Sequence, residues 1–60
     1  MIYNNVMLKV KNAADVEAVA ELLSEQARLS SEEPGCARFE VYHSQADHLQ
    51  FLLVEQWNTE

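Results

Sequence analysis

The chain ends its last apolar run with Glu55, Gln56 and Trp57, and this ending holds the side chains best suited to chemistry. Alternate residues of a strand point to the same face, so Glu55 and Trp57 share one. An indole N–H can donate a hydrogen bond to a substrate oxygen, and an enclosed carboxylate can accept a proton. Trp57 and Glu55 are therefore candidate catalytic residues. The alternatives are plain packing for the indole and a solvated strand end for the carboxylate.

Three further residues are candidates for binding a substrate. Phe51 and Leu53 share the face of Trp57 and are suited to an apolar substrate-binding surface. Tyr42, on the preceding apolar run, offers a phenol that can donate and accept hydrogen bonds. Arg38 and Glu40, at alternate positions before Tyr42, are charged. The alternative for Tyr42 is therefore cross-strand pairing on a solvent-exposed edge of the sheet.

Metal and nucleotide sites are not predicted. Cys36, His43 and His48 are three potential ligands at irregular intervals, whereas structural zinc needs four in compact pairs. Cys36 is interpreted as a small buried residue after a turn, because a nucleophile would need a base that the sequence does not identify. The chain has one glycine, which leaves no glycine-rich phosphate loop.

Composition restricts the partners and the compartment. Ten acidic and four basic residues give a net charge of −6, which repels phosphate backbones, and the basic residues form no stripe. We therefore expect neither nucleic acid nor a membrane as a partner. A single cysteine and the lack of a long apolar run or leader are typical of a cytoplasmic protein of one small domain, residues 1–60.

The hydrophobic pattern predicts a strand followed by a helix. Ile2 to Lys11 alternates with period two, as in a half-buried strand. Asn12 is expected to cap a helix that begins near Ala13, and Glu25 with Arg28 to form an i,i+3 ion pair. The apolar stripe that would cover a sheet consists of Val16, Ala20, Leu23 and Ala27.

A turn and two strands follow. The ring of Pro34 disfavours helical geometry at Glu33, and Gly35 is expected to adopt a positive φ. Alternation resumes from Cys36 to His43, with Ala37, Phe39 and Val41 expected on one face, and a polar loop over 44–48 precedes a strand from Leu49 to Trp57. The predicted fold is α+β, a β-α-β-β arrangement with an antiparallel sheet and one covering helix.

The last strand is apolar on both faces. Phe51, Leu53 and Trp57 lie on one side, and Leu52 and Val54 lie on the other. Because one helix layer covers one face of a sheet, the second apolar face is expected to pack against the sheet of another copy. The sequence therefore predicts a homodimer or a higher oligomer.

In this order and spacing, three short motifs resemble the antibiotic biosynthesis monooxygenase family of dimeric α/β barrels. They are Glu33-Pro34-Gly35-Cys36, Phe39-Glu40-Val41-Tyr42 and Glu55-Gln56-Trp57. The resemblance implies a ferredoxin-like β-α-β-β-α-β subunit with a cavity between sheet and helices. Trp57 matches a polar cavity residue of the family, and Asn4 matches one by its place on the first strand. The family's second helix and fourth strand would follow Asn58 and Thr59, so the domain is expected to be incomplete at its C-terminus.

The resemblance implies a cofactor-free monooxygenase that acts with dioxygen on a small aromatic or quinol-type substrate. Trp57, Asn4 and Glu55 would then be the catalytic residues, with Asn4 donating a hydrogen bond to a substrate oxygen. A non-catalytic small-molecule binding or assembly module of the same fold is the alternative. Haem handling, known among relatives, is disfavoured because their catalytic histidine has no counterpart here.

Overall fold

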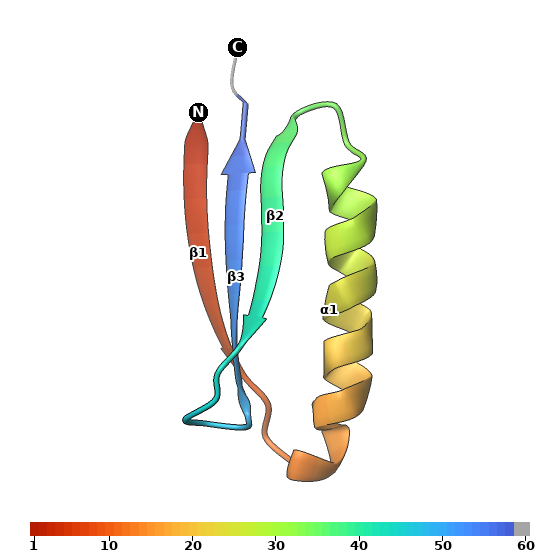
Figure 1. The fold of residues 1–60 in the computed structure, drawn as a ribbon, viewed down its shortest axis with the longest axis vertical. Coiled ribbons are helices and arrows are strands. Elements are labelled where there is room, and N and C mark those ends of the chain that lie inside the picture. Colours follow the sequence, from red (N-terminus) through yellow and green to blue (C-terminus); the bar gives the residue numbers. More distant parts are fainter. Residues whose placement is uncertain (59–60) are drawn as a thin grey trace.

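The structure, a computed structural model, describes residues 1–58 and contains three strands and one long helix (Figure 1). In chain order these elements are β1 (Ile2–Lys9), a 3-10 turn η1 (Ala13–Asp15), α1 (Val16–Ser31), β2 (Cys36–His43) and β3 (Gln50–Trp57). The strands form one sheet in the order β1-β3-β2, and β3 is antiparallel to both neighbours.

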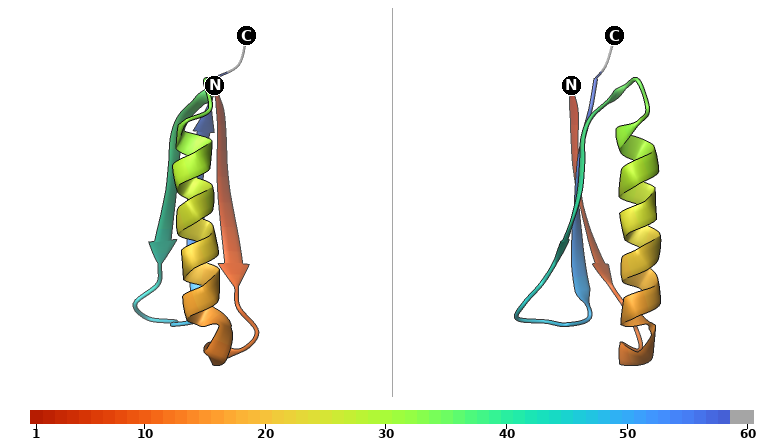
Figure 2. Two further views of the ribbon diagram at one scale, coloured as in Figure 1. Left: turned by 90° about the vertical axis from the view of Figure 1, so that its right-hand side faces the viewer. Right: turned by 45° about the vertical axis from the view of Figure 1, so that its right-hand side comes forward.

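The molecule has two layers. Helix α1 lies along one face of the sheet, and the opposite face carries no covering element among the described residues (Figure 2). Strands β1 and β2 run parallel with β3 between them, and α1 connects them, which is the split β-α-β arrangement of ferredoxin-like folds. The α+β prediction is confirmed.

Cross-strand register assigns each side chain of the sheet to a face. The helix-side face carries Phe51 and Leu53, which are buried, together with the residues paired to them. We use "open face" for the opposite side, which is made by Tyr3, Asn5, Met7 and Lys9 of β1, Arg38, Glu40 and Tyr42 of β2, and Gln50, Leu52, Val54 and Gln56 of β3.

The core lies where the N-terminal half of α1 meets the hairpin end of the sheet. Val10, Val16 and Phe51 are buried there, and Leu8, Val19, Ala20, Leu23, Val41 and Leu49 pack against them. The predicted helical stripe thus faces the sheet, as expected from its spacing. On the exposed side of α1 the predicted ion pair forms, with Arg28 Nη2 2.6 Å from Glu25 Oε1, and this contact lowers the pKa of Glu25.

Two local predictions at the ends of the helix were wrong. The side chain of Asn12 makes no capping hydrogen bond; the backbone N–H of Asp15 instead donates to the Asn12 carbonyl at 3.0 Å, which closes the 3-10 turn. Gly35 does not have a positive φ. The Cys36 N–H donates to the Glu33 carbonyl at 3.0 Å, so Pro34 and Gly35 form the centre of a turn that ordinary negative φ values can close.

A β-bulge changes the face expected for Ala37. The register jumps between Cys36, opposite Trp57, and Arg38, opposite Gln56, so Ala37 has no partner on β3 and is exposed. A bulge inserts one residue and restores alternation beyond it. From Phe39 onward the predicted faces of β2 are therefore correct.

The loop between β2 and β3 is held by its own side chains. Ser44 Oγ accepts hydrogen bonds from the N–H groups of Ala46 and Asp47, at 3.2 and 3.0 Å. Asp47 accepts the Leu49 N–H at 3.1 Å and pairs with Lys9 Nζ at 3.0 Å. The contact with Lys9 ties the loop to β1, the far edge of the sheet.

Replacing Asp47 with alanine is expected to lower the urea midpoint at neutral pH and to change it little in strong acid. The hydrogen bond from Lys9, and next that from Leu49, lowers the pKa of Asp47. A carboxyl whose pKa is lower in the folded state stabilises that state above its unfolded pKa, and the contribution disappears as the pH falls through the folded pKa. Urea titrations at a series of pH values measure this difference. Asp47→Asn, which keeps an acceptor for Leu49, is the matched control, and a loss independent of pH would contradict the assignment.

Candidate functional site

Trp57, Glu55 and Asn4 come together at the end of the helix-side face that holds the turn after α1. The Trp57 indole N–H donates to Glu55 Oε1 at 3.0 Å. Asn4 on β1 lies directly opposite Glu55 in the antiparallel register, which places both side chains on the same face. The two strands thus bring a carboxylate, an indole N–H and an amide to one site.

Phe39 forms a wall of this site that the sequence did not single out. Its ring meets the Trp57 ring edge to face, with centroids 6.5 Å apart and an interplanar angle of 81°. Phe39 is also the β2 partner of Glu55. The available signal was its alternation with Val41, which indicated the correct face but not the contact with Trp57.

The site opens toward β1, because α1 covers the β2 edge of this same face and, among the described residues, makes no close backbone contact with β1. Ile2 and Val6 belong to the helix-side face, yet they remain 49% and 42% exposed. Glu55 and Trp57 are half-buried, and Asn4 is exposed. This leaves an apolar strip beside Asn4 that a planar ligand can contact without displacing the helix.

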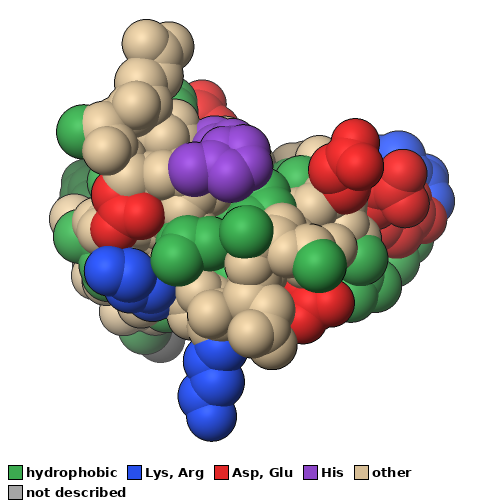
Figure 3. Space-filling view, turned by 90° about the horizontal axis from the view of Figure 1, so that it is seen from below, with side chains coloured by type: hydrophobic (Ala, Val, Ile, Leu, Met, Phe, Trp, Pro, Cys, Tyr) green, Lys and Arg blue, Asp and Glu red, His purple; other side chains and the backbone are tan. Residues whose placement is uncertain are grey.

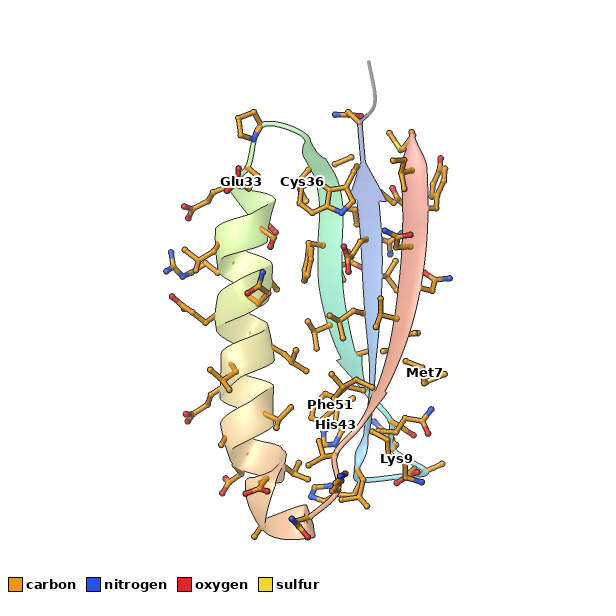
Figure 4. The ribbon with its side chains drawn as sticks, turned by 180° about the vertical axis from the view of Figure 1, so that it is seen from behind. Met7, Lys9, Glu33, Cys36, His43 and Phe51 are labelled. Carbon is orange, nitrogen blue, oxygen red and sulfur yellow. The ribbon has the colours of Figure 1, made fainter. Side chains whose placement is uncertain are left out.

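Of the two predicted apolar binding residues, Leu53 adjoins the site and Phe51 does not. Leu53 is buried and lies next to Glu55 on the same face of β3. Phe51 lies six residues from Trp57, about 20 Å along an extended strand. It is 2% exposed and stacks on His43 with centroids 4.3 Å apart (Figure 4). Phe51 therefore belongs to the core under the start of α1.

Tyr42 lies on the open face, so the sheet separates it from Trp57, Glu55 and Asn4. Its hydroxyl donates to Glu40, and Arg38 Nη2 lies 2.6 Å from Glu40 Oε1. Arg38, and next Tyr42, lowers the pKa of the Glu40 carboxyl, while Glu40 raises that of the guanidinium. The alternative for Tyr42 was cross-strand pairing on a solvated edge; the structure instead shows a polar cluster on the exposed side of one strand, β2.

His43 and His48 lie at the two ends of the β2–β3 loop. Figure 4 shows His43 far from Cys36, which lies at the other end of β2. His43 Nε2 is 2.6 Å from the His48 carbonyl oxygen, and the two rings have centroids 5.1 Å apart. Cys36 is a free, half-buried thiol opposite Trp57 on the neighbouring strand. Within residues 1–58, no group of three or more His, Cys, Asp or Glu side chains is arranged to hold a metal ion.

The arrangement around Trp57 can bind a small aromatic molecule and accept one proton from it. Phe39 and Trp57 offer ring faces and edges, Asn4 offers an amide for a substrate oxygen, and Glu55 offers a carboxylate whose geometry the indole fixes. In the part of the chain described, no helix has the length and apolarity to cross a bilayer.

Comparison with known proteins identifies the family. The sequence profile described as antibiotic biosynthesis monooxygenase matches residues 1–60. No curated protein and no solved structure matches the chain. The ferredoxin-like fold expected of that family agrees with the β1-β3-β2 sheet and its single covering helix. The expected second helix and fourth strand lie outside the described residues. The chain belongs to the antibiotic biosynthesis monooxygenase family.

Proposed function

We propose that this chain is a monooxygenase domain that acts with dioxygen, and without a bound cofactor, on a small aromatic or quinol-type substrate. The observation that carries the proposal is the indole N–H of Trp57 held 3.0 Å from the Glu55 carboxylate, with Asn4 opposite. Membership of the family supports the reaction class. We further propose a cytoplasmic homodimer, with the open face of each sheet turned to the other copy.

The chemistry needs a substrate that becomes electron-rich when it loses a proton. In an anthrone, Glu55 would take a proton from the ring system, and the resulting anion would pass an electron to dioxygen. One oxygen atom then becomes the new carbonyl and the other leaves as water, so the substrate methylene supplies all four electrons. Asn4 would stabilise negative charge on the substrate oxygen, and the indole N–H, released once Glu55 has taken the proton, would then donate to the same oxygen.

The shape of the site supports a flat ligand. Phe39 and Trp57 form a corner of two rings at 81°, and Leu53 continues the apolar wall along β3. The exposed side chains of Ile2 and Val6 offer further apolar surface on β1. A planar substrate lying across β1 and β3 would bury this surface, which supplies binding energy that does not depend on the reacting atoms.

Oxygen uptake with a panel of hydroquinones and anthrones tests the proposal. We expect uptake above buffer with at least one compound, and its loss in Trp57→Phe. Tyr42→Phe, on the opposite face, is the matched control and should retain uptake. Uptake equal to buffer across the whole panel, with compounds still bound, would contradict catalysis and identify a binding or assembly module.

A further inference from the structure

The open face is the part of the surface on which two copies of this acidic chain can meet. Six of the ten acidic residues lie on the helix and its flanks, at positions 15, 17, 21, 25, 32 and 33. Figure 3 shows acidic side chains gathered over α1. On the open face, Glu40 is paired with Arg38 at 2.6 Å, so no unpaired carboxylate faces outward there. Mutual repulsion of two molecules of charge −6 is therefore weakest through this face.

The open face has a hollow at one end and a projecting ring at the other. A pocket of about 220 Å³ lies near the β2–β3 loop, and Met7, Leu52 and Tyr42, one row across the three strands, contribute to its lining. Met7 projects on the side away from α1 (Figure 4). Tyr3 lies on the same face, near the opposite end of β1, and is 68% exposed.

The spacing of these two features is compatible with a symmetric pair. Tyr3 and Met7 are four residues apart on β1, about 13 Å along an extended strand. A twofold axis that crosses the strands midway, at the row of Asn5 and Val54, makes facing strands antiparallel. It brings the row of Tyr3 in each copy over the row of Met7 in the other copy, so the interface contains two equivalent contacts.

We propose that the pocket at Met7, Leu52 and Tyr42 is completed by Tyr3 of a second copy, so that each molecule supplies one ring and receives one. The phenol ring would contact the thioether of Met7 and the apolar side of Leu52, a favourable sulfur–aromatic arrangement. The inference rests on the proposed self-association and adds its register. It is independent of oxygen chemistry, which is measured separately.

Cross-linking of mixed variants tests the register directly. In a Cys36→Ser background, one preparation carries Tyr3→Cys and a second carries Met7→Cys, and the two are mixed and treated with a short bismaleimide. A cross-linked dimer is expected from the mixture and not from either preparation alone. A mixture of Tyr3→Cys with Leu22→Cys, which lies on α1 and is 70% exposed, is the matched control and should give none.

Sedimentation of the unmodified chain separates the two possible failures. We expect a dimer at micromolar concentration, and Tyr3→Ala should weaken it at least tenfold, while Leu22→Ala should leave it unchanged. A monomer at that concentration would overturn both the self-association and the proposed binding of Tyr3 in the pocket of the second copy. A dimer that gives no cross-link in the mixture, or that cross-links equally well through Tyr3→Cys alone, would overturn only the register proposed here.

Discussion

Replacing Phe51 with alanine is expected to unfold most of the protein at room temperature. Its ring is 2% exposed, stacks on His43 and packs with Val10 and Val16. Truncation of a buried phenylalanine costs about 3 to 5 kcal/mol. In a chain of sixty residues, a single hydrophobic core rarely supplies more than about 3 to 5 kcal/mol of stability. The substitution is therefore expected to remove most or all of the free energy of unfolding.

Circular dichroism with urea titration measures this effect. Leu22→Ala is the control, because the exposed side chain of Leu22 leaves no cavity, and its expected change is within about 0.5 kcal/mol. Phe51→Leu, which keeps much of the volume, is expected to fall between the two. A cooperative transition at an unchanged midpoint for Phe51→Ala would show that the core does not depend on this ring.

For the proposed reaction, replacing Trp57 with phenylalanine is expected to reduce turnover on the order of 100-fold, because it removes a hydrogen-bond donor from the charged intermediate. The indole N–H also fixes Glu55, at 3.0 Å. Glu55→Gln is expected to reduce turnover by a similar factor, since proton acceptance contributes about 100-fold or more.

The double variant distinguishes a cooperating pair from two separate residues. Residues that act as one unit are not additive, so Trp57→Phe with Glu55→Gln is expected to lose little more than either single variant. Steady-state oxygen uptake at several substrate concentrations provides both kcat and KM. Tyr42→Phe, on the open face, is the control. Full turnover by Trp57→Phe would remove the indole from the mechanism.

The sequence predicted the elements and the two faces of the sheet well. Alternation set the faces of β3 correctly, because a strand with buried residues on one side tolerates no slip of register. The shared face of Glu55 and Trp57 followed from the same rule. The third catalytic candidate, Asn4, depended on a resemblance, since pairing between β1 and β3 joins residues about fifty positions apart and leaves no local signal.

The errors have local physical causes. The bulge at Ala37 preserves hydrophobic alternation on either side, so the sequence pattern does not reveal it. Gly35 was expected to need a positive φ, but a turn with proline at its second position also closes with negative values. Phe51 was grouped with Trp57 by strand face and Tyr42 by its hydroxyl, whereas the fold places Phe51 about 20 Å along β3 and Tyr42 on the opposite face of the sheet.

The two outer strands differ in their protection against unwanted growth of the sheet. β2 carries Arg38 and Glu40 and is distorted by its bulge, features that discourage another chain from adding alongside. β1 is eight residues long, has neither proline nor glycine, and holds a single charge, Lys9, at its end. Wherever its outer backbone groups stay unpaired, β1 can template a further strand, so this edge is where an additional strand is expected to pair.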